Sequence, residues 1–574
     1  MRLATALLLL FALAAVACQR DAAPAAATDA QDVPAPWSDD PAAQRIEADV
    51  RYLADDRLEG REAGTRGYDL AAGYIARRYD EIGLQPAGDG ETYFQHVPLL
   101  KATLQQDGAR LVVRRDGRET ALEFKRDFLP SANFNAPEFS VEAPAVFVGQ
   151  GVHAPELDQD DFAGLDLTGK IAVLFGGAPE RFDNDRRAFY SSSREKLRSV
   201  AERGAVGAIF VGTAEDEARS PWARGAENWA RPTMRLRGED GQALDSFPQL
   251  RGVARVSAAA ADALFVGGER SAAQLFDAAK AGTLEGFDLP GTVLIAGKAE
   301  LEPLESRNVV GRIPGSDPAL ATEHIVYTAH LDHVGIGAPV KNDRGEDDRI
   351  YNGALDNALG VAIMLEAAKQ LQDAADKPKR SLLFVALTAE EKGLLGSDWF
   401  ARNPTVPKDS LVANINMDMP VMTAPSTDVV PIGIEHSSLK GVVEAAAKEI
   451  GVALSPDPFP EEVVFVRSDQ YSFVRAGIPA VYLDGGVVSA DGERDPKVAL
   501  TYFLRNCYHQ PCDDADQPIQ YGDAARLARL NARIGRIVGD AEARPTWNEG
   551  DFFGDRFGAP RAASATQAPG RDGP

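Results

Sequence analysis

Positive charge, long apolar runs and internal repeats are scarce in this chain of 574 residues. Its 61 basic residues face 86 acidic ones, which gives a net charge of −25. Such a balance argues against nucleic acid and anionic membrane surfaces as partners. Only one apolar run approaches the length of a spanning helix, at the very start of the chain. No repeat is visible, and a 44% apolar composition leaves room for two or three domains with sizeable cores.

The opening segment, MRLATALLLLFALAAVAC, reads as an export signal. Its apolar stretch is shorter than the roughly 20 residues that a spanning helix needs, and small residues precede Cys18. This resembles a bacterial lipoprotein signal over residues 1–18, with a lipid on Cys18 as the membrane tether. The mature protein would then be a periplasmic or cell-envelope lipoprotein. The alternative is an ordinary cleaved signal.

Cysteine is rare as well, since only Cys507 and Cys512 follow Cys18. In an oxidising compartment so close a pair favours a small local disulfide loop. A C-x4-C metal site is the competing interpretation. It lacks a second Cys/His pair nearby.

Changes in composition and in expected secondary structure along the chain indicate more than one domain. Residues 19–42 are rich in Ala, Pro and Asp and are typical of a flexible linker. A helical pattern starts at Ala43, and a hairpin is expected around residues 110–124. Residues 140–301 change to short strands, turns and small helices, with one histidine, His153, and no clustered metal ligands. We therefore expect an insert there, which divides a catalytic part into residues 43–139 and 302–545. The tail, residues 546–574, is expected to be disordered.

Three apolar runs of the catalytic part end in side chains that bind metals. HIVYTAHLDH ends in His330 and Asp332, SLLFVALTAEE ends in Glu390 and Glu391, and LVANINMD ends in Asp418. Buried strands of a parallel or mixed sheet present their carboxyl ends at one edge, where open α/β sheets place ligands. The sequence therefore predicts an α/β fold with a mixed sheet flanked by helices and a site at that edge.

The candidate metal ligands are oxygen and nitrogen donors, without thiolates: His330, Asp356, Glu391, Asp418 and His509. Such a set suits Zn²⁺ with positions left open for water and substrate. Five ligands exceed the needs of one catalytic zinc. Two Zn²⁺ ions that share one bridging carboxylate fit better, and such a pair polarises a carbonyl and generates hydroxide at neutral pH.

The motifs AHLDH, NGALDNALGVA, TAEEKGLLGS, NINMDM, RSDQYSF and YHQP resemble those of the co-catalytic two-zinc exopeptidases. That family includes bacterial leucine aminopeptidases and glutamate carboxypeptidases. The resemblance covers about Ala43–Pro137 and Glu305–Ala541. The insert at 140–301 resembles a protease-associated domain, expected to be mainly β, through GKIAVLFGG and AVGAIFVG.

The resemblance implies a role for each motif residue. Asp356 would bridge the two zincs, and the peptide bond after it would be cis. His330 and Asp418 would bind one zinc, and Glu391 and His509 the other. Glu390 would be the general base. Asp332 could accept the imidazole N–H of His330. Tyr508 is either a donor to the tetrahedral oxyanion or a packing aromatic.

Other polar residues near the motifs carry alternatives. His333 is expected to support the ligands or to pack, rather than to be a sixth ligand. The acidic stretch 341–349 is expected to be a solvated loop. The alternative is a Ca²⁺ site, with oxygen donors from Asp343, Glu346, Asp347 and Asp348.

The expected function is a zinc exopeptidase acting on peptides, with an aminopeptidase favoured. Asp469 or other carboxylates near the zincs would receive a substrate's α-ammonium group. The alternative is a carboxypeptidase, which needs cations for the terminal carboxylate, and Arg467 and Arg475 lie in the same stretch. A receptor on the same fold is disfavoured by the intact ligand set. The sequence leaves the oligomeric state open.

Overall fold

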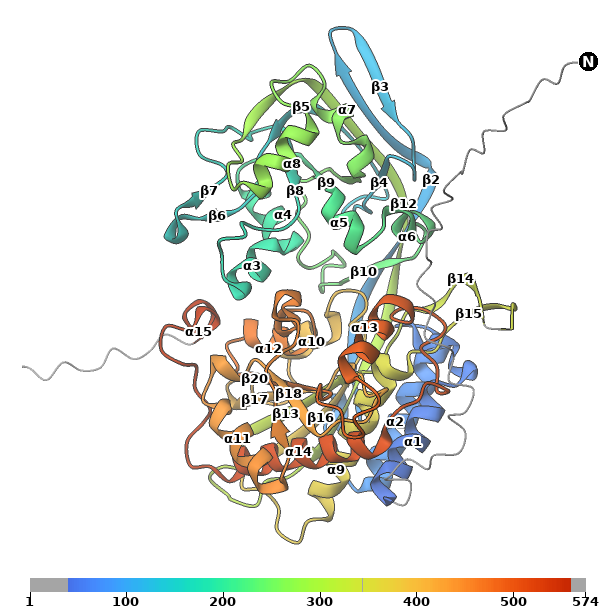
Figure 1. The fold of residues 1–574 in the computed structure, drawn as a ribbon, viewed down its shortest axis with the longest axis vertical. Helices are drawn as coiled ribbons and strands as arrows, with labels where there is room; N and C mark the ends of the chain where they lie inside the picture. Colours follow the sequence, from blue (N-terminus) through green and yellow to red (C-terminus); the bar gives the residue numbers. More distant parts are fainter. Residues whose placement is uncertain (1–39, 343, 559–574) are drawn as a thin grey trace, which may run out of the picture.

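The computed structural model describes residues 40–342 and 344–558. Two bodies are joined by a pair of long antiparallel strands, β2 (Phe94–Arg115) and β12 (Phe287–Ile313), which run through both (Figure 1). We call the upper body the insert and the lower one the main part. Cys18 and the signal segment lie outside the described residues. Within the described ranges, no helix has the length and apolarity that crossing a membrane requires.

The main part is built on one mixed sheet with helices on both faces. Its strands run in the order β19-β18-β20-β17-β13-β16-β12, and β13, β16, β17 and β20 are parallel to their neighbours in that group. The strand bounds are β13 (His324–His330), β16 (Ser381–Leu387), β17 (Leu411–Asn416), β18 (Asp428–Ile432), β19 (Ala453–Leu454) and β20 (Ala480–Asp484). The predicted mixed sheet flanked by helices is confirmed.

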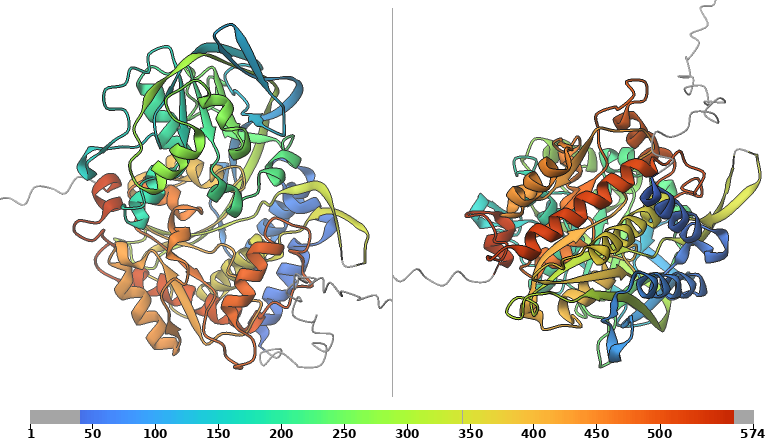
Figure 2. Two further views of the ribbon diagram at one scale, coloured as in Figure 1. Left: turned by 45° about the horizontal axis from the view of Figure 1, so that its top comes forward. Right: turned by 90° about the horizontal axis from the view of Figure 1, so that it is seen from below.

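Alternation along the buried strands explains the two helical layers. In β16, Leu382 and Phe384 pack into one core cluster, while Leu383 and Val385 pack into another on the opposite face. Figure 2 shows helices covering the sheet as seen from below. The first layer holds α1 (Pro41–Leu53), α2 (Arg66–Ile82), α9 (Leu359–Asp373), α11 (Leu439–Ile450) and α14 (Tyr521–Asp540). The second holds α10 (Leu395–Arg402) and α12 (Gln470–Arg475).

The insert extends the main sheet and has core clusters of its own. The order β12-β5-β8-β9-β11-β4 continues the main sheet, and β5, β8, β9 and β11 are parallel to one another. The bounds are β4 (Phe128–Pro130), β5 (Glu138–Phe147), β8 (Ile171–Phe175), β9 (Gly207–Val211) and β11 (Gly252–Val256). Its helices are α3 (Asn184–Ser191), α4 (Ser193–Glu202), α5 (Ala214–Arg219), α6 (Trp222–Glu227), α7 (Asp262–Phe265) and α8 (Ala272–Lys280).

Several expected elements are present. The hairpin is formed by β2 and β3 (Arg118–Leu122). A helical pattern also continues beyond α1: helix α2 ends at Gly83, whose φ of 88° is the left-handed conformation of a C-cap. Short strands complete the set: β1 (Gln85–Pro86), β6 (His153–Ala154), β7 (Gln159–Asp160) and β10 (Thr233–Leu236).

The structure differs from the sequence expectations at both ends. Helix α1 begins at Pro41 and is capped by Asp40, so the predicted linker extends too far. The expected disordered tail was wrong for residues 546–558. There, α15 (Phe552–Phe557) buries Phe553 completely, and the Trp547 indole donates a hydrogen bond to the Gly477 carbonyl at 2.9 Å. Trp547, Phe552, Phe553 and Phe557, which alternate with glycines and polar residues, provide this anchoring.

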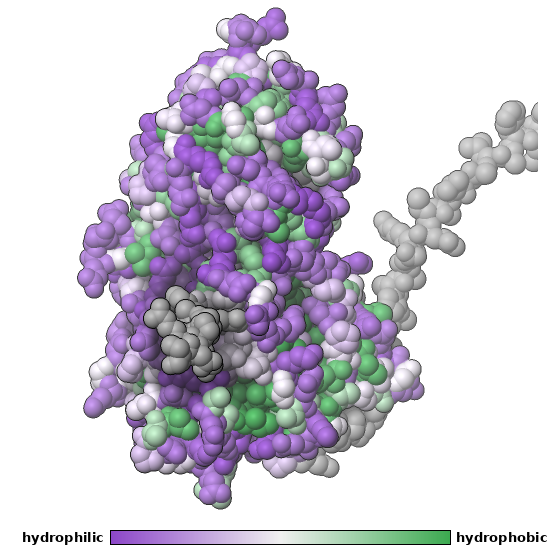
Figure 3. All heavy atoms as spheres, turned by 90° about the vertical axis from the view of Figure 1, so that its left-hand side faces the viewer, coloured by the Kyte–Doolittle hydropathy of each residue, from purple (hydrophilic) through white to green (hydrophobic). Residues whose placement is uncertain are grey.

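The acidic stretch 341–349 forms a hairpin. Its strands are β14 (Gly335–Lys341) and β15 (Asp347–Tyr351), and Lys341 pairs with Asp347 at 2.7 Å. Asp343 lies outside the described residues. The face shown in Figure 3 is mostly hydrophilic over both bodies, as the high content of charged residues leads one to expect.

Candidate metal centre

The edge of the main sheet gathers the predicted ligands. His330 ends β13, Glu390 and Glu391 follow β16, and Asp418 follows β17. Because these neighbouring strands are parallel, their carboxyl ends meet at one edge. Asp356 comes from the turn of π-helix Ala354–Ala358 that precedes α9. His509 comes from the loop after α13 (Pro496–Asn506).

Asp356 lies between two groups of donors. Its Oδ1 is 3.2 Å from His330 Nε2, which is 3.0 Å from Asp418 Oδ1. Its Oδ2 is 3.1 Å from His509 Nε2, which is 3.1 Å from Glu391 Oε2. The two oxygens of one carboxylate thus face different ligand sets, which is the arrangement expected of a bridge.

We name the two groups by a histidine. The His330 cluster consists of His330, Asp356 and Asp418, and the His509 cluster of His333, Asp356, Glu391 and His509. Within each cluster the donor atoms lie within 4.8 Å of one another. Across the described residues, these are the groups of three or more such side chains that could hold a metal. The hairpin at 341–349 contributes to neither.

The donor sets fit metal ions. All donors are nitrogen or oxygen, as borderline and hard cations prefer. Both ring nitrogens of His333 and Oε1 of Glu391 are buried without a hydrogen-bond partner in the described chain. Buried polar atoms rarely stay unpaired, so the facing pair of His333 Nδ1 and Glu391 Oε1, 2.9 Å apart, indicates a ligand.

Asn357 anchors the bridging residue. The Asp356–Asn357 peptide bond is cis, as the resemblance implied. The Asn357 amide donates to the Met417 carbonyl at 3.0 Å, and its oxygen accepts from the Gly360 and Met419 amides, each at 3.0 Å. The start of α9 is thereby attached to the end of β17. A Cβ on Gly360 would lie 2.1 Å from Asn357 Oδ1, so only glycine fits there.

Asp332 acts differently from the prediction. His330 Nδ1 lies 3.0 Å from the backbone carbonyl of Asp332 and 4.0 Å from its carboxylate. The carboxylate instead accepts the backbone N–H groups of Glu390 at 3.0 Å and Glu391 at 3.3 Å. The chain turns after β13, which moves the side chain off the strand face assumed for it. Asp332 therefore fixes the loop that carries the two glutamates.

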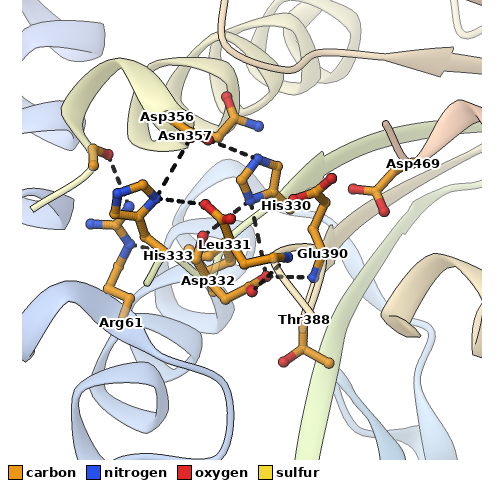
Figure 4. Close-up of polar contacts among 12 residues, drawn as sticks. Arg61, His330, Leu331, Asp332, His333, Asp356, Asn357, Thr388, Glu390 and Asp469 are labelled. Atoms are coloured by element: carbon orange, nitrogen blue, oxygen red, sulfur yellow. Dashed lines mark hydrogen bonds and ion pairs between the residues drawn. The ribbon is translucent and has the colours of Figure 1, made fainter. Parts of the chain in front are cut away.

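Glu390 is outside both clusters and beside the His330 cluster. In Figure 4 it lies next to His330, with Asp469 beyond it, while His333 lies on the other side next to Arg61. Burial raises the pKa of Glu390 well above its ordinary value, an effect that His330 partly offsets. Burial also raises the pKa of Asp469 to about 7. Asp469 is fully buried, and neither carboxylate oxygen has a hydrogen-bond partner among the described residues.

The predicted disulfide between Cys507 and Cys512 is present. The residue after this loop, Asp513, contacts the segment of the bridging residue Asp356, and sequence reasoning missed it. The buried Asp513 carboxylate accepts the backbone N–H groups of Leu355 at 2.8 Å and Asp356 at 3.1 Å. Burial raises its pKa to about 8. Its position directly after a cysteine was the available signal.

Arg61 was also missed. Its buried guanidinium donates to four carbonyls, those of Leu53, Leu331, Asn352 and Gly353. Leu331 adjoins His330, and Gly353 lies three residues before Asp356. One side chain therefore joins the first helical region to both segments that deliver metal ligands. A lone arginine in a Gly-containing turn carries no pattern that would have identified it.

The remaining predicted residues lie near the site with partners of their own. The Tyr508 ring stacks on His509 at 3.9 Å and packs against the main core. The oxyanion role for Tyr508 stays a prediction. Arg467 pairs with Glu462 at 2.9 Å, and Arg475 pairs with Asp398 at 2.6 Å. Neither arginine is therefore a free cation.

Comparison with known proteins follows the same division of the chain. Residues 308–534 match the sequence model described as Peptidase family M28. This stretch contains every residue of both clusters together with Glu390. The expected resemblance is confirmed there, since residues 308–534 are similar to Peptidase family M28. The match does not extend to the insert, so its assignment as a protease-associated domain stays a prediction.

Relatives differ in how much they share. Aminopeptidase Y of Saccharomyces cerevisiae is 30% identical over 223 residues, 37% of this chain and 35% of that protein. A probable glutamate carboxypeptidase of Arthroderma benhamiae is 26% identical over 69% of this chain and 55% of its own length. This chain thus spans about a third to a half of the curated relatives named here.

A solved structure shares the fold. The aminopeptidase from Aneurinibacillus sp. strain AM-1 is 21% identical, with a TM-score of 0.50. The match covers 88% of this chain and 95% of that one. At this identity the likeness supports the fold alone.

Proposed function

We propose that this chain is a two-zinc exopeptidase that removes the amino-terminal residue of peptides. The observation that carries the proposal is the placement of Asp356, whose two oxygens face separate donor clusters. Glu390 stands beside those clusters and in neither of them. A carboxylate so placed remains available for proton transfer.

The proposed reaction is hydrolysis of a peptide bond. Bound zinc would polarise the substrate carbonyl and lower the pKa of the attacking water. Glu390 accepts a proton from that water and delivers it to the leaving amine. Asp332 holds the backbone of Glu390 and Glu391 in place through its two hydrogen bonds. The raised pKa of Glu390 suits a group that must both take up and release a proton.

Charge at the site favours a substrate with a free α-ammonium group. Asp469 is buried, and both of its carboxylate oxygens lack a hydrogen-bond partner among the described residues, so they are available to the N–H donors of an ammonium group. Arg467 is paired with Glu462, and Arg475 is paired with Asp398. A carboxypeptidase would need an available cation, because a substrate's terminal carboxylate must be paired when it is desolvated.

The test uses two dipeptides with zinc present. One is blocked at its amino end, and the other is amidated at its carboxyl end. An aminopeptidase cleaves the amidated peptide and leaves the blocked one intact. The reverse result would reject the proposal in favour of a carboxypeptidase.

A carboxypeptidase is the second candidate, because the relative named a probable glutamate carboxypeptidase matches over 69% of this chain. A receptor is disfavoured by the complete donor set. Metal analysis separates the receptor from both enzymes, since zinc below one equivalent per chain would favour it.

The proposal includes export and a lipid tether at Cys18, which rest on the leader sequence alone. Mass spectrometry of the amino-terminal peptide from cells would reveal a diacylglyceryl-modified cysteine. Replacement of Cys18 by Ser should release the protein from the membrane fraction. Cleavage elsewhere, without lipid, would support the ordinary signal peptide.

A further inference from the structure

His333 occupies a fixed place beside the His509 cluster. The residue is fully buried, and its backbone N–H donates to the Arg61 carbonyl at 3.3 Å. Gly353 lies against the ring, because a Cβ there would be 2.6 Å from His333 Cγ. Backbone on both sides therefore sets where the imidazole points. The ring has little freedom to turn away from the cluster.

The contact between His333 and Glu391 is close without being a hydrogen bond. Nδ1 lies 2.9 Å from Glu391 Oε1 and 3.8 Å from Asp356 Oδ2. Yet Nδ1, Nε2 and Glu391 Oε1 all lack a hydrogen-bond partner within the described ranges. Leaving such groups buried and unpaired costs free energy. A cation placed between the nitrogen and the oxygens would satisfy both sides at once.

The spacing of the donors agrees with that reasoning. Two ligands of one tetrahedral zinc, each about 2.0–2.1 Å from the ion, are about 3.4 Å apart. The two His333 distances lie on either side of that value. The distances from His509 Nε2 to Glu391 Oε2 and Asp356 Oδ2, both 3.1 Å, are close to it. His333 and His509 thus stand in similar relations to the same two carboxylates.

We infer that His333 is a metal ligand, the fourth side chain on the zinc held by Glu391 and His509. The inference rests on the proposed function, which supplies the metal pair. It makes the two sites unequal. The His509 cluster offers four side chains, as closed zinc sites do, and the His330 cluster offers three, as open catalytic sites do.

Because the His330 cluster offers one side chain fewer, the coordination position left open for water lies on its side. Glu390 lies on that side, next to His330, and belongs to neither cluster. In Figure 4 Glu390 and His333 lie on opposite sides of His330. The base therefore faces the cluster with room for water, and His333 completes the other one.

Loss of metal affinity alone would not test this inference. A residue that merely supports a ligand also costs about 10–100-fold in affinity when it is replaced. The number of imidazoles bound to zinc distinguishes the two roles. Zinc-edge X-ray absorption measures that number from the scattering of the outer ring atoms. It needs no turnover.

The experiment compares three proteins loaded with two equivalents of zinc. Wild type should show three imidazoles for two zincs, and His333→Phe should show two. His324→Gln is the matched control, because His324 is a buried histidine at the opposite end of β13, hydrogen-bonded to Ser410 at 2.9 Å. That control should retain three.

Two imidazoles for two zincs in wild type would overturn the inference. That count decides the question even if His333→Phe does not fold. A protein that binds fewer than two zincs would instead contradict the proposed two-zinc function. The two failures are therefore distinguishable.

Discussion

The insert and the main part use the same device, a group of parallel buried strands, with opposite results. In the main part β13, β16 and β17 are followed by histidine and carboxylates. In the insert β8, β9 and β11 are followed by Gly176, Gly212 and Ser257. Those ends border a cavity of about 770 Å³ that reaches Lys392 and Asp398 of the main part. Fold alone therefore does not make a metal centre; the residues that terminate the strands do.

The largest expected effect is the loss of activity on replacing Glu390, at the edge of the main sheet, when the matching change at the edge of the insert has no effect. Replacement of Glu390 by Gln should lower kcat by about 10²–10⁴, because the amide cannot accept the proton from water. Zinc content and melting temperature should stay unchanged, since Glu390 belongs to neither cluster. The measurement is peptide hydrolysis together with metal analysis.

The control lies at the edge of the insert. Glu217 accepts a hydrogen bond from the Ala258 backbone at 2.7 Å, which Gln can still accept. Glu217→Gln should therefore leave turnover unaffected. Full activity in Glu390→Gln would remove the proposed base.

A smaller effect is expected at Asp513, whose carboxylate holds the backbone of the bridging residue Asp356. Asn can accept one of the two backbone N–H groups of Leu355 and Asp356, but its own NH₂ would face the other. We expect Asp513→Asn to weaken zinc binding by about 10–100-fold. Chelator competition measures this change. The neighbouring Asp514→Asn is the control, and equal losses in both variants would contradict a specific role.

The acid limb of the pH profile tests the role of Glu390 as the base. The base must be ionised to accept a proton, and burial raises its pKa. Activity should therefore fall by about tenfold per unit as pH is lowered past the pKa of Glu390, and Glu390→Gln should remove this acid limb. Measurement of kcat against pH at saturating zinc, in wild type and in Glu390→Gln, tests this. An acid limb that persists unchanged in Glu390→Gln would contradict it.

The smallest effect on stability is expected at the disulfide. Cys507 and Cys512 are five residues apart, so their bond adds less than the roughly 3 kcal/mol of a 15-residue loop. Replacing both with Ser should lower zinc affinity and turnover more than the melting temperature, because the loop carries His509 and leads to Asp513. A large loss of melting temperature with unchanged zinc affinity would reverse this assignment.

Much of the site followed from sequence because strand ends are local features. His330, Glu391 and Asp418 each end an apolar run, and parallel pairing then brings them together. The supporting residues were less accessible. Arg61 reaches the Asn352 and Gly353 carbonyls from nearly 300 residues away along the chain, and no periodicity marks such a contact. The Asp332 carboxylate binds the backbone of Glu390 and Glu391 instead of the His330 ring, because the backbone changes direction after β13.

Prediction of the fold failed where composition and contacts disagree. Residues 546–558 are rich in Gly and polar residues, yet Phe553 packs among aromatic side chains of the main part. From sequence, His333 was expected to support the ligands or to pack. Its orphaned nitrogens, visible only in three dimensions, favour a different role.

The continuity of β12 has a mechanical consequence. Residues 287–298 of that strand pair with β5 in the insert, residues 309–313 pair with β16, and β2 pairs with the strand across the junction. A hinge needs a few residues free to change their backbone angles, whereas β12 is hydrogen-bonded to β2 throughout the junction. The two bodies are thus linked by continuous paired strands, and β12 pairs directly with β16, the strand that leads to Glu390. Heating should melt both bodies in one cooperative step.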